Sequence, residues 1–435
     1  MIDLSTIKHI HIVGVGGIGV SALARLMCIE GRRVTATDKS ESRVTDELSR
    51  AGVVLRIGNW PEAAAEAELL VFSKAVPEDD PDRQAAREAK VKEISYAELL
   101  GLVSQSKRTI AITGTHGKTT TTAMLATIAQ EAGLDPTAII GSIVQDFGSN
   151  LLVGVGELLI TEACEYQRSF LSLHPYIMVM LNVDLDHLDY YKDLPDIQSA
   201  FSKLTDQIVP GGVLIYDSRD SNQDPIVGHL LKTAASRDIT LVDYSQIALP
   251  IQLKLYGNFN QHNAQAAIAV AGTLSIDEKT ARMTLIHFSG TWRRQEFRGE
   301  SKSGVKVYDD YGHNPTEVAA HISAARAHFE NEKMVVIFQP HLFSRTKTFL
   351  SEFATSFVGA DAVIVLPIYA ARETNSYNVS HRDLAAKIND TGLEAHTANS
   401  FDEALQMVKH LLPNGGVAIT QGAGDVHKVG ELILA

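Results

Sequence analysis

The stretch TIAITGTHGKTTTTAML, residues 109–125, places a glycine turn between an apolar β-branched run and a helix-forming run. The first run predicts a buried strand over residues 109–113, and the second predicts a helix over residues 119–130. The turn between them, residues 114–118, would direct backbone N–H groups and the positive end of the helix dipole toward an anion. The stretch therefore predicts a strand, a phosphate-binding turn and a helix.

The turn carries the residues of a nucleotide site but is shorter than the general phosphate-loop pattern. That pattern, G-x-x-x-x-G-K-[ST], expects its first glycine where Ile112 stands. Lys118 would reach the β and γ phosphates, and the hydroxyl of Thr119 would bind Mg²⁺. The alternative is a polar loop that caps an ordinary helix and binds no nucleotide.

The composition is typical of a soluble protein with more than one domain. A chain of 435 residues exceeds what one hydrophobic core usually serves, so two or three domains are expected. The net charge of -13 argues against broad nucleic-acid binding, because phosphate backbones require clustered Lys and Arg. Two cysteines, Cys28 and Cys164, and the lack of a membrane-length apolar run predict a cytoplasmic protein without membrane insertion. The sequence indicates no particular oligomeric state.

The N-terminal residues predict a βαβ unit with a second glycine turn. A strand in HIHIVGV, a turn in GVGGIG, a helix in VSALARLMCIEG and a strand in RVTATD follow one another. Gly14, Gly16 and Gly19 match G-x-G-x-x-G, and Asp38 closes the second strand. The pattern predicts a dinucleotide site or a site for another diphosphate, since the same turn can enclose either.

Strands and helices alternate along the rest of the chain, which predicts an α/β fold with mostly parallel sheets. Middle strands are expected in ELLITEA, YIMVMLNVD and GGVLIYD, and later strands in KVYDDY, KMVVIFQP, DAVIVLPIY and GVAITQGAG. We predict three domains. They are an N-terminal Rossmann-like domain over residues 1–105, a central phosphate-loop ATPase domain over residues 106–299 and a C-terminal Rossmann-like domain over residues 300–435.

Acidic and imidazole side chains follow two strands of the middle block. Glu162 and Glu165 follow one strand, and Asp186 and His187 follow another. Because loops after parallel strands gather at one edge of a sheet, both groups are expected near Lys118. A carboxylate and a neutral imidazole suit a second divalent ion beside the phosphates, and we favour Glu162 as the carboxylate. The alternative is that these are surface acids and a helix cap.

Further polar residues occupy candidate positions in the second half of the chain. Asn260 and Asn263, three apart at an expected helix start, suit recognition of a base edge, although capping explains one asparagine equally well. Arg345 is able to bind a carboxylate through two guanidinium nitrogens. The polar residues expected in loops after the last strands are Asp310, His313, His341 and Arg345.

The order of these motifs resembles the Mur ligase family. The family's loop, T-G-T-x-G-K-T, is matched by residues 113–119, so the short turn is similar to that family's own version. Ser21 and Ala22 after the first glycine turn are similar to the alanine-adding members. The resemblance runs nearly the whole length, through GVGGIGVSALA, TGTHGKTTT, EACEY, DHLDYY, GNFNQHNAQAA, GTWRRQEF, DDYGHNPTE, FQPHLFSRTK and YAARE.

The resemblance implies an ATP-dependent amide ligase of peptidoglycan synthesis. ATP would phosphorylate the carboxylate of UDP-N-acetylmuramate, and the amine of L-alanine would then attack the acyl phosphate. Two Mg²⁺ ions are expected to neutralise the charge that gathers there. The N-terminal glycine turn would hold the UDP diphosphate instead of a nicotinamide cofactor.

The resemblance also implies roles for particular residues. The expected catalytic residues are Lys118, His187 and Arg294. The expected ATP-binding residues are Gly114, Thr115, His116, Gly117, Lys118, Thr119, Thr120, Asn260, Asn263, Arg294 and Asp310. The expected UDP-sugar residues are Gly14, Gly16, Gly17, Gly19 and Asp38. The expected amino-acid residues are His341, Arg345, Tyr369 and Glu373, and the expected metal ligands are Thr119, Glu162 and His187.

Three alternatives stay open at the level of the sequence. The first is a sister ligase that adds another amino acid or a peptide. The second is a nicotinamide-dependent dehydrogenase, in which Asp38 would bind the ribose diol. The third is a nucleotide-binding module without catalytic activity.

Overall fold

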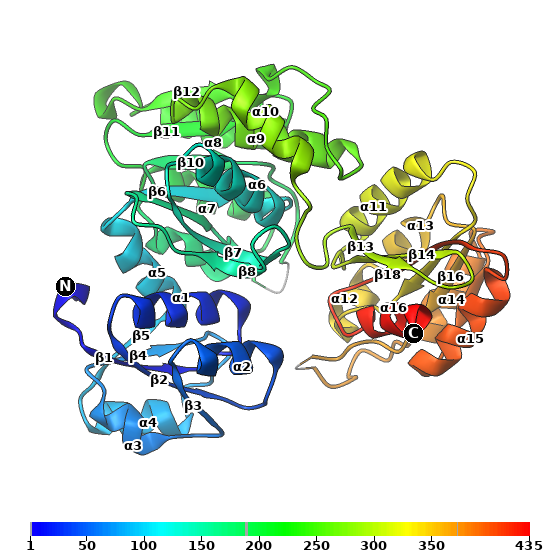
Figure 1. The fold of residues 1–435 in the computed structure, drawn as a ribbon, viewed down its shortest axis with the longest axis horizontal. Coiled ribbons are helices and arrows are strands. Elements are labelled where there is room, and N and C mark those ends of the chain that lie inside the picture. The colour runs from blue at the N-terminus through cyan, green and yellow to red at the C-terminus, as the bar shows by residue number, and fades with distance from the viewer. Residues whose placement is uncertain (1, 188–189, 372) are drawn as a thin grey trace. The chain divides into compact units, whose positions relative to one another are not determined.

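The computed structural model describes residues 2–187, 190–371 and 373–435, whose strands form three sheets with helices on their faces (Figure 1). Nearly all neighbouring strands are parallel, which confirms the predicted α/β class. Among these described residues, every helix is too short or too polar to cross a bilayer.

The first sheet contains parallel strands in the order β3-β2-β1-β4-β5. Its strands are β1 (His9–Val13), β2 (Arg33–Asp38), β3 (Val54–Ile57), β4 (Leu69–Phe72) and β5 (Lys92–Ser95). The accompanying helices are α1 (Ile18–Ile29), α2 (Arg43–Arg50), α3 (Pro61–Glu66), α4 (Pro81–Glu88) and α5 (Tyr96–Gln105). The strand order reverses at β1, so the GVGGIG turn lies at the switch point where doubly wound sheets bind ligands.

The second sheet has the order β12-β11-β10-β6-β9-β7-β8 and is parallel except where β7 pairs with β8. Its strands are β6 (Arg108–Thr113), β7 (Thr137–Val144), β8 (Ser149–Leu152), β9 (Leu158–Glu162), β10 (Ile177–Met180), β11 (Val213–Tyr216) and β12 (Thr240–Asp243). The accompanying helices are α6 (Lys118–Glu131), α7 (Leu194–Thr205), α8 (Asp224–Leu231), α9 (Asn258–Thr273) and α10 (Glu278–His287). Because β6 lies between β9 and β10, the loops after these three strands meet at one edge.

Continuous apolar runs explain why β6 and β10 lie at the centre of the second sheet. Parallel strands covered by helices are buried on both faces, so they need apolar residues at successive positions. All of β10, and residues 110–112 of β6, have no exposed surface. The strand and helix predicted on either side of the glycine turn are confirmed as β6 and α6.

The third sheet has the order β13-β14-β18-β15-β16-β17 and is parallel except where β13 pairs with β14. Its strands are β13 (Glu296–Glu300), β14 (Val305–Asp310), β15 (Met334–Phe338), β16 (Ala362–Val365), β17 (Ala395–Thr397) and β18 (Gly416–Gln421). The accompanying helices are α11 (Pro315–His328), α12 (Phe343–Thr348), α13 (Leu350–Thr355), α14 (His381–Asn389), α15 (Phe401–Leu411) and α16 (His427–Leu434).

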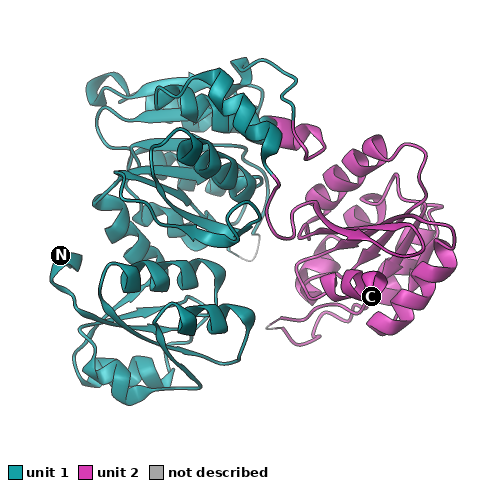
Figure 2. Cartoon of the chain, in the orientation of Figure 1, with its two compact units in different colours: residues 1–252, 262–288 teal, residues 253–261, 289–435 magenta. Residues whose placement is uncertain are grey.

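The chain forms two compact units (Figure 2). The first unit, residues 1–252 and 262–288, contains the first two sheets, and the second unit, residues 253–261 and 289–435, contains the third. The expected boundary between residues 299 and 300 falls inside β13, whose polar sequence EFRGE carries no recognisable strand pattern. Pairing with β14 makes this segment part of the last sheet.

Candidate active site

Two glycines shape the turn between β6 and α6. Gly114 has φ 137°, and Gly117, the residue before α6, has φ 86°, so both adopt conformations that favour glycine. A Cβ atom on Gly117 would also overlap the side-chain oxygen of Asn263. The loop therefore brings its backbone to the start of α6, as an anion site requires. Thr119 and Thr120 follow in the first turn of α6 and are buried.

Asn182, two residues after the end of the apolar strand β10, fixes the shape of this turn. The backbone N–H of His116 donates to Oδ1 of Asn182 (2.7 Å), and Nδ2 of Asn182 donates to the carbonyl of His116 (3.0 Å). The N–H of Asp184 donates to the hydroxyl of Thr115 (2.8 Å). Sequence reasoning missed Asn182, although a polar residue at the carboxyl end of a central strand is the signal that identifies it.

Lys118 is held by two loop carbonyls and by a buried carboxylate. Its Nζ donates to the carbonyl oxygens of Gly114 (2.5 Å) and Thr115 (3.1 Å). The same Nζ lies 2.9 Å from one oxygen of Glu165, and the other oxygen of Glu165 lies 3.3 Å from Nε2 of His187. Glu165, only 3% exposed, therefore connects the phosphate loop to the loop after β10.

The charges of these three groups depend on one another. Burial by itself would raise the pKa of the Glu165 carboxyl, but Lys118 and His187 outweigh burial and lower that pKa to about 2. Burial would lower the pKa of Lys118, yet the carboxylate of Glu165 raises it above its usual value. Burial would also lower the pKa of His187, but Glu165 and Asp186 raise it above its usual value. At neutral pH the cluster therefore contains an ionised carboxylate and a protonated lysine.

Glu162, the carboxylate favoured from the sequence, is the last residue of β9. One of its oxygens accepts a hydrogen bond from the backbone N–H of Gly141 in β7. Burial and then the Glu162 carboxylate raise the pKa of Tyr96, the first residue of α5. The structure thus pairs Glu165 with Lys118 and His187, and the charge of Glu162 also acts on Lys118.

The donors at this edge fit Mg²⁺ only together with phosphate oxygens. Within the described ranges, no three His, Cys, Asp or Glu side chains form a ready-made metal-binding group. Mg²⁺ in nucleotide sites usually takes one or two protein ligands and completes its six positions with phosphate oxygens and water. The candidate ligands are the carboxylate of Glu162 at the end of β9, the imidazole of His187 after β10 and the hydroxyl of Thr119 at the start of α6. Their number and kind meet that requirement.

The N-terminal glycine turn is closed by Asp38. The backbone N–H of Gly16 donates to Oδ2 of Asp38 (2.7 Å), and Gly14 has φ 75°. Gly17 precedes the first residue of α1, so the turn leads directly into a helix N-terminus. A Cβ atom on Gly19 would lie 2.5 Å from the hydroxyl of Tyr96, so this glycine allows α1 and Tyr96 to approach closely. The turn has the form of a diphosphate site.

The two asparagines expected to bind ATP, Asn260 and Asn263, have different surroundings. Nδ2 of Asn260 donates to the carbonyl of Tyr256 (2.9 Å) and to the side-chain oxygen of Gln295 (2.8 Å), and Asn260 is buried. Asn263, one turn further along α9, has its side-chain oxygen against Gly117. The contact places Asn263 at the phosphate loop.

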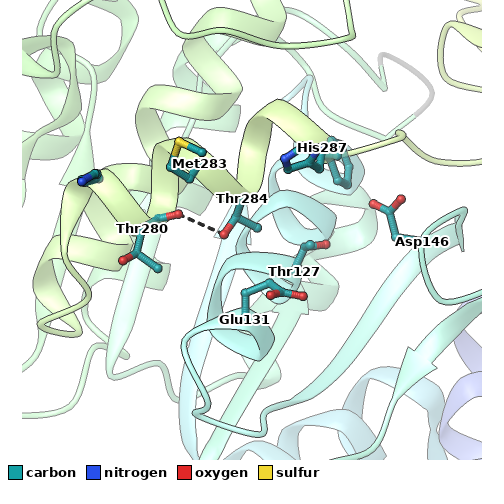
Figure 3. Close-up of a pocket in the computed structure, with 9 residues that line it drawn as sticks. Thr127, Glu131, Asp146, Thr280, Met283, Thr284 and His287 are labelled. Carbon is teal, nitrogen blue, oxygen red and sulfur yellow. Dashed lines mark hydrogen bonds between the residues drawn. The ribbon is translucent and has the colours of Figure 1, made fainter.

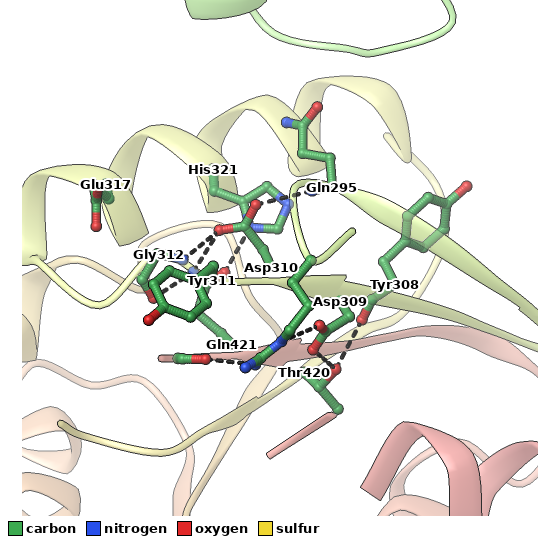
Figure 4. A network of polar contacts seen from close by, with 12 residues as sticks. Gln295, Tyr308, Asp309, Asp310, Tyr311, Gly312, Glu317, His321, Thr420 and Gln421 are labelled. Carbon is green, nitrogen blue, oxygen red and sulfur yellow. Dashed lines mark hydrogen bonds and ion pairs between the residues drawn. The ribbon is translucent and has the colours of Figure 1, made fainter. Parts of the chain in front are cut away.

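Asp310 is hydrogen-bonded within the last sheet (Figure 4). One of its oxygens accepts from the N–H of Gln295 (2.9 Å), and the other accepts from the N–H of Gly312 (2.8 Å) and from Nε2 of Gln421 (2.9 Å). Asp310 therefore organises the loop after β14.

Arg293, which sequence reasoning did not select, is buried beside the expected catalytic Arg294. Its Nε lies 2.7 Å from Asp309, and its other nitrogens donate to the carbonyls of Gly424 (2.7 Å) and Gly422 (2.6 Å). Arg293 therefore stabilises the last sheet. Arg294 is half-buried and does not share these contacts of Arg293.

Three of the four expected amino-acid residues lie together. The rings of His341 and Tyr369 are stacked with centroids 5.7 Å apart, and Nη1 of Arg345 lies 3.2 Å from Nδ1 of His341. Glu373 binds the backbone N–H (3.0 Å) and the hydroxyl of Ser344 on α12. We call His341, Arg345 and Tyr369 the amino-acid cluster.

His313 and Arg294 lie beside the amino-acid cluster. The rings of His313 and His341 are 5.6 Å apart, and the ring of Tyr311 lies 5.5 Å from that of His313. The guanidinium of Arg294 lies 5.1 Å from the ring centre of Tyr311. Burial is the main cause that lowers the pKa of His313. The neighbourhood therefore combines guanidinium groups with a neutral imidazole, which suits a small molecule with a carboxylate.

A groove between α6 and α10 has a volume of about 620 Å³ (Figure 3). None of the residues expected at the active site lines it. Its walls are formed by Thr127, Glu131, Asp146, Lys279, Thr280, Met283, Thr284, His287 and Phe288. The candidate active site is therefore identified by its chemical groups and their place at the sheet edge.

Family models match the chain in three consecutive segments. The model described as Mur ligase family, catalytic domain, matches residues 9–108. The Mur ligase middle domain matches residues 112–245, and the Mur ligase, glutamate ligase domain, matches residues 293–424. These segments follow the three sheets in order.

Relatives match over the full length. The chain is 36% identical over 455 residues to UDP-N-acetylmuramate–L-alanine ligase of Caldanaerobacter subterraneus subsp. tengcongensis, covering 100% of this chain and 98% of that protein. It is 37% identical over 449 residues to the protein of the same name from Clostridium acetobutylicum, covering 98% of each.

Solved structures of related ligases match the fold over nearly the full chain. UDP-N-acetylmuramate-alanine ligase from Thermotoga maritima matches with a TM-score of 0.81 and 26% identity over 98% of both chains. A murein peptide ligase from Psychrobacter arcticus, at 22% identity and a TM-score of 0.70 over 98% of both chains, shares the fold. The fold and family predicted from the sequence are confirmed, and the chain belongs to the Mur ligase family.

Proposed function

We propose that this Mur ligase joins L-alanine to the carboxylate of UDP-N-acetylmuramate, with ATP converted to ADP and phosphate. The phosphate loop carries this proposal, because it places Lys118 beside the loops after β9 and β10 at the sheet edge where nucleotides bind. The names of full-length relatives support the two other substrates. Both cysteines are free thiols, which is in keeping with a cytoplasmic enzyme.

The chemistry requires charge to be neutralised where two anions meet. A carboxylate oxygen of the sugar attacks the γ-phosphorus and ADP leaves, which gives an acyl phosphate. The amine of alanine then attacks the acyl carbon, and the tetrahedral intermediate expels phosphate. Lys118 and the loop N–H groups neutralise the transferring phosphoryl group. Bound Mg²⁺, for which we propose two ions and the ligands Thr119, Glu162 and His187, supplies further positive charge there.

The remaining groups hold the other two substrates. The glycine turn from Gly14 to Gly19 receives the UDP diphosphate at the N-terminus of α1. The amino-acid cluster binds the carboxylate of alanine through Arg345. Arg294 contacts the phosphates. Asn260, Asn263 and Asp310 contact the nucleoside of ATP.

The reaction class is tested by measuring phosphate release with each of the common amino acids in turn. We expect release from ATP only when UDP-N-acetylmuramate and L-alanine are both present. Release with a different amino acid or with a peptide would favour a sister ligase. Oxidation or reduction of a nicotinamide in the absence of ATP would favour a dehydrogenase.

Replacing Arg345 with alanine should raise the KM for L-alanine by about a hundredfold, because a charge-assisted bidentate contact is lost. The KM values for ATP and UDP-N-acetylmuramate should change little. Steady-state kinetics at saturating levels of the other substrates measure this. Lys347→Ala, at an exposed position on the same helix, is the matched control. An unchanged KM for alanine in Arg345→Ala would remove Arg345 from the substrate site.

Replacing His187 with alanine should raise the Mg²⁺ concentration needed for half-maximal activity, and added Mg²⁺ should restore part of the rate. A magnesium titration of phosphate release measures the shift. His229→Ala, which removes an exposed imidazole paired with Asp206, should leave the titration unchanged. A His187→Ala curve with the wild-type midpoint would show that His187 is not a metal ligand.

A further inference from the structure

Glu165 is the buried carboxylate nearest to Lys118, and the proposed reaction leaves it without a role. Its two oxygens lie 2.9 Å from Nζ of Lys118 and 3.3 Å from Nε2 of His187. A carboxylate buried in this way needs compensating positive charge. The same lysine charge is the one that the phosphates of ATP would use.

The backbone holds Glu165 in this position at a cost in strain. Gln167 and Arg168, which follow it, have φ angles of 51° and 55°, and His187 has φ 54°. Such conformations are rare for residues other than glycine and persist where surrounding contacts impose them. The hydroxyl of Tyr191 donates to the carbonyl of Glu165 (2.6 Å), and the N–H of Arg168 donates to the same oxygen (2.9 Å).

We propose that Glu165 is a positioning residue, the internal counter-ion that holds Lys118 and His187 at the phosphate loop and releases the lysine to the phosphates of ATP. The expected effect on kcat rests on the proposed function, whereas the expected effect on ATP binding does not. The carboxylate and the phosphates then compete for Lys118. Glu165 therefore weakens nucleotide binding while it keeps the two cationic side chains aligned for the chemical step.

Because Glu165 and the phosphates compete for Lys118, replacing Glu165 with a neutral residue should strengthen the binding of ATP. The carbonyls of Gly114 and Thr115 also bind Nζ of Lys118, so in a Glu165 variant we expect the lysine to remain near the loop but to lose its alignment. Its charge is then no longer neutralised by a carboxylate. Glu165→Gln should bind ATP about fivefold to tenfold more tightly than the wild type, because one nearby negative charge is removed. The value of kcat should fall about tenfold or more.

The test measures ATP binding to the full chain by titration calorimetry in EDTA, and again at a fixed free Mg²⁺ concentration. Steady-state kinetics of the same variants follow. Glu157→Gln is the matched control, because Glu157 is an exposed carboxylate just before β9 that pairs with Arg108 at 3.5 Å. Glu165→Asp keeps the charge on a shorter side chain and should retain the wild-type affinity for ATP with a lower kcat.

Tighter ATP binding in EDTA together with a lower kcat supports the proposal. Unchanged or weaker ATP binding in EDTA overturns it, and a larger Mg²⁺ requirement in the same variant would show that Glu165 is a metal ligand instead. Lower affinity with a loss of thermal stability would show a structural role. The binding measurement in EDTA needs neither the sugar nor the amino acid. An enzyme with other substrates would therefore still give a clear answer on Glu165.

Discussion

Replacing Lys118 with alanine is expected to lower ATP-dependent phosphate release by about a thousandfold or more. The variant loses the cation that we propose faces the transferring phosphoryl group, in a reaction whose catalysis consists mainly of charge neutralisation. The KM for ATP should rise as well. Phosphate release with both co-substrates present measures the effect.

The binding of UDP-N-acetylmuramate is the internal control for this variant. The glycine turn belongs to the first sheet and Lys118 to the second, so Lys118→Ala should bind the sugar nucleotide with nearly wild-type affinity. Lys232→Ala, which removes an exposed lysine after α8, should leave the rate unchanged. Equal loss of turnover and sugar-nucleotide binding would contradict the assignment of the two sites to different domains.

Replacing Arg293 with methionine is expected to lower the free energy of unfolding of the third-sheet unit by about 3–5 kcal/mol, because it leaves the carboxylate of Asp309 buried without its partner. Both side chains are almost fully buried, at 3% and 1% exposed, and Arg293 also loses its bonds to two backbone carbonyls. Denaturant unfolding followed by the fluorescence of Trp292 measures this. Trp60 is the other tryptophan of the chain, and Trp60→Phe makes Trp292 the single reporter.

Arg298→Met is the matched control for the loss of a guanidinium group. Arg298 lies on β13 and pairs with Glu296 at 2.9 Å, but it is 28% exposed. Exposed ion pairs contribute about 1 kcal/mol or less, so the unfolding transition should move little. Equal effects of the two substitutions would contradict a special role for the buried pair.

The fold could be predicted because the central strands of the sheets consist of consecutive apolar residues. The strands β10 and β16 contain only buried apolar residues, and a glycine turn follows β6. The first strand of the third sheet could not be predicted. The strand β13 reads as a polar segment, and it is a strand only because β14 provides a partner.

The candidate site could be predicted as a set of loops but not as a set of contacts. Parallel topology was sufficient to bring Lys118 and His187 to one edge. The pairing of Glu165 with Lys118 and His187 depends on the left-handed turn at residues 167 and 168, which no residue preference indicates. In the same way, the sequence does not show which of Arg293 and Arg294 is buried. Arg293 is buried because its guanidinium pairs with Asp309 on β14.

Transfer of ¹⁸O from the sugar carboxylate to phosphate tests the central claim most directly. UDP-N-acetylmuramate labelled in both carboxylate oxygens is incubated with ATP, L-alanine and the enzyme, and the released phosphate is analysed by mass spectrometry. An acyl phosphate formed at the phosphate loop requires that each phosphate carries one ¹⁸O from the carboxylate. Release of phosphate that contains no ¹⁸O from the labelled substrate would contradict the account.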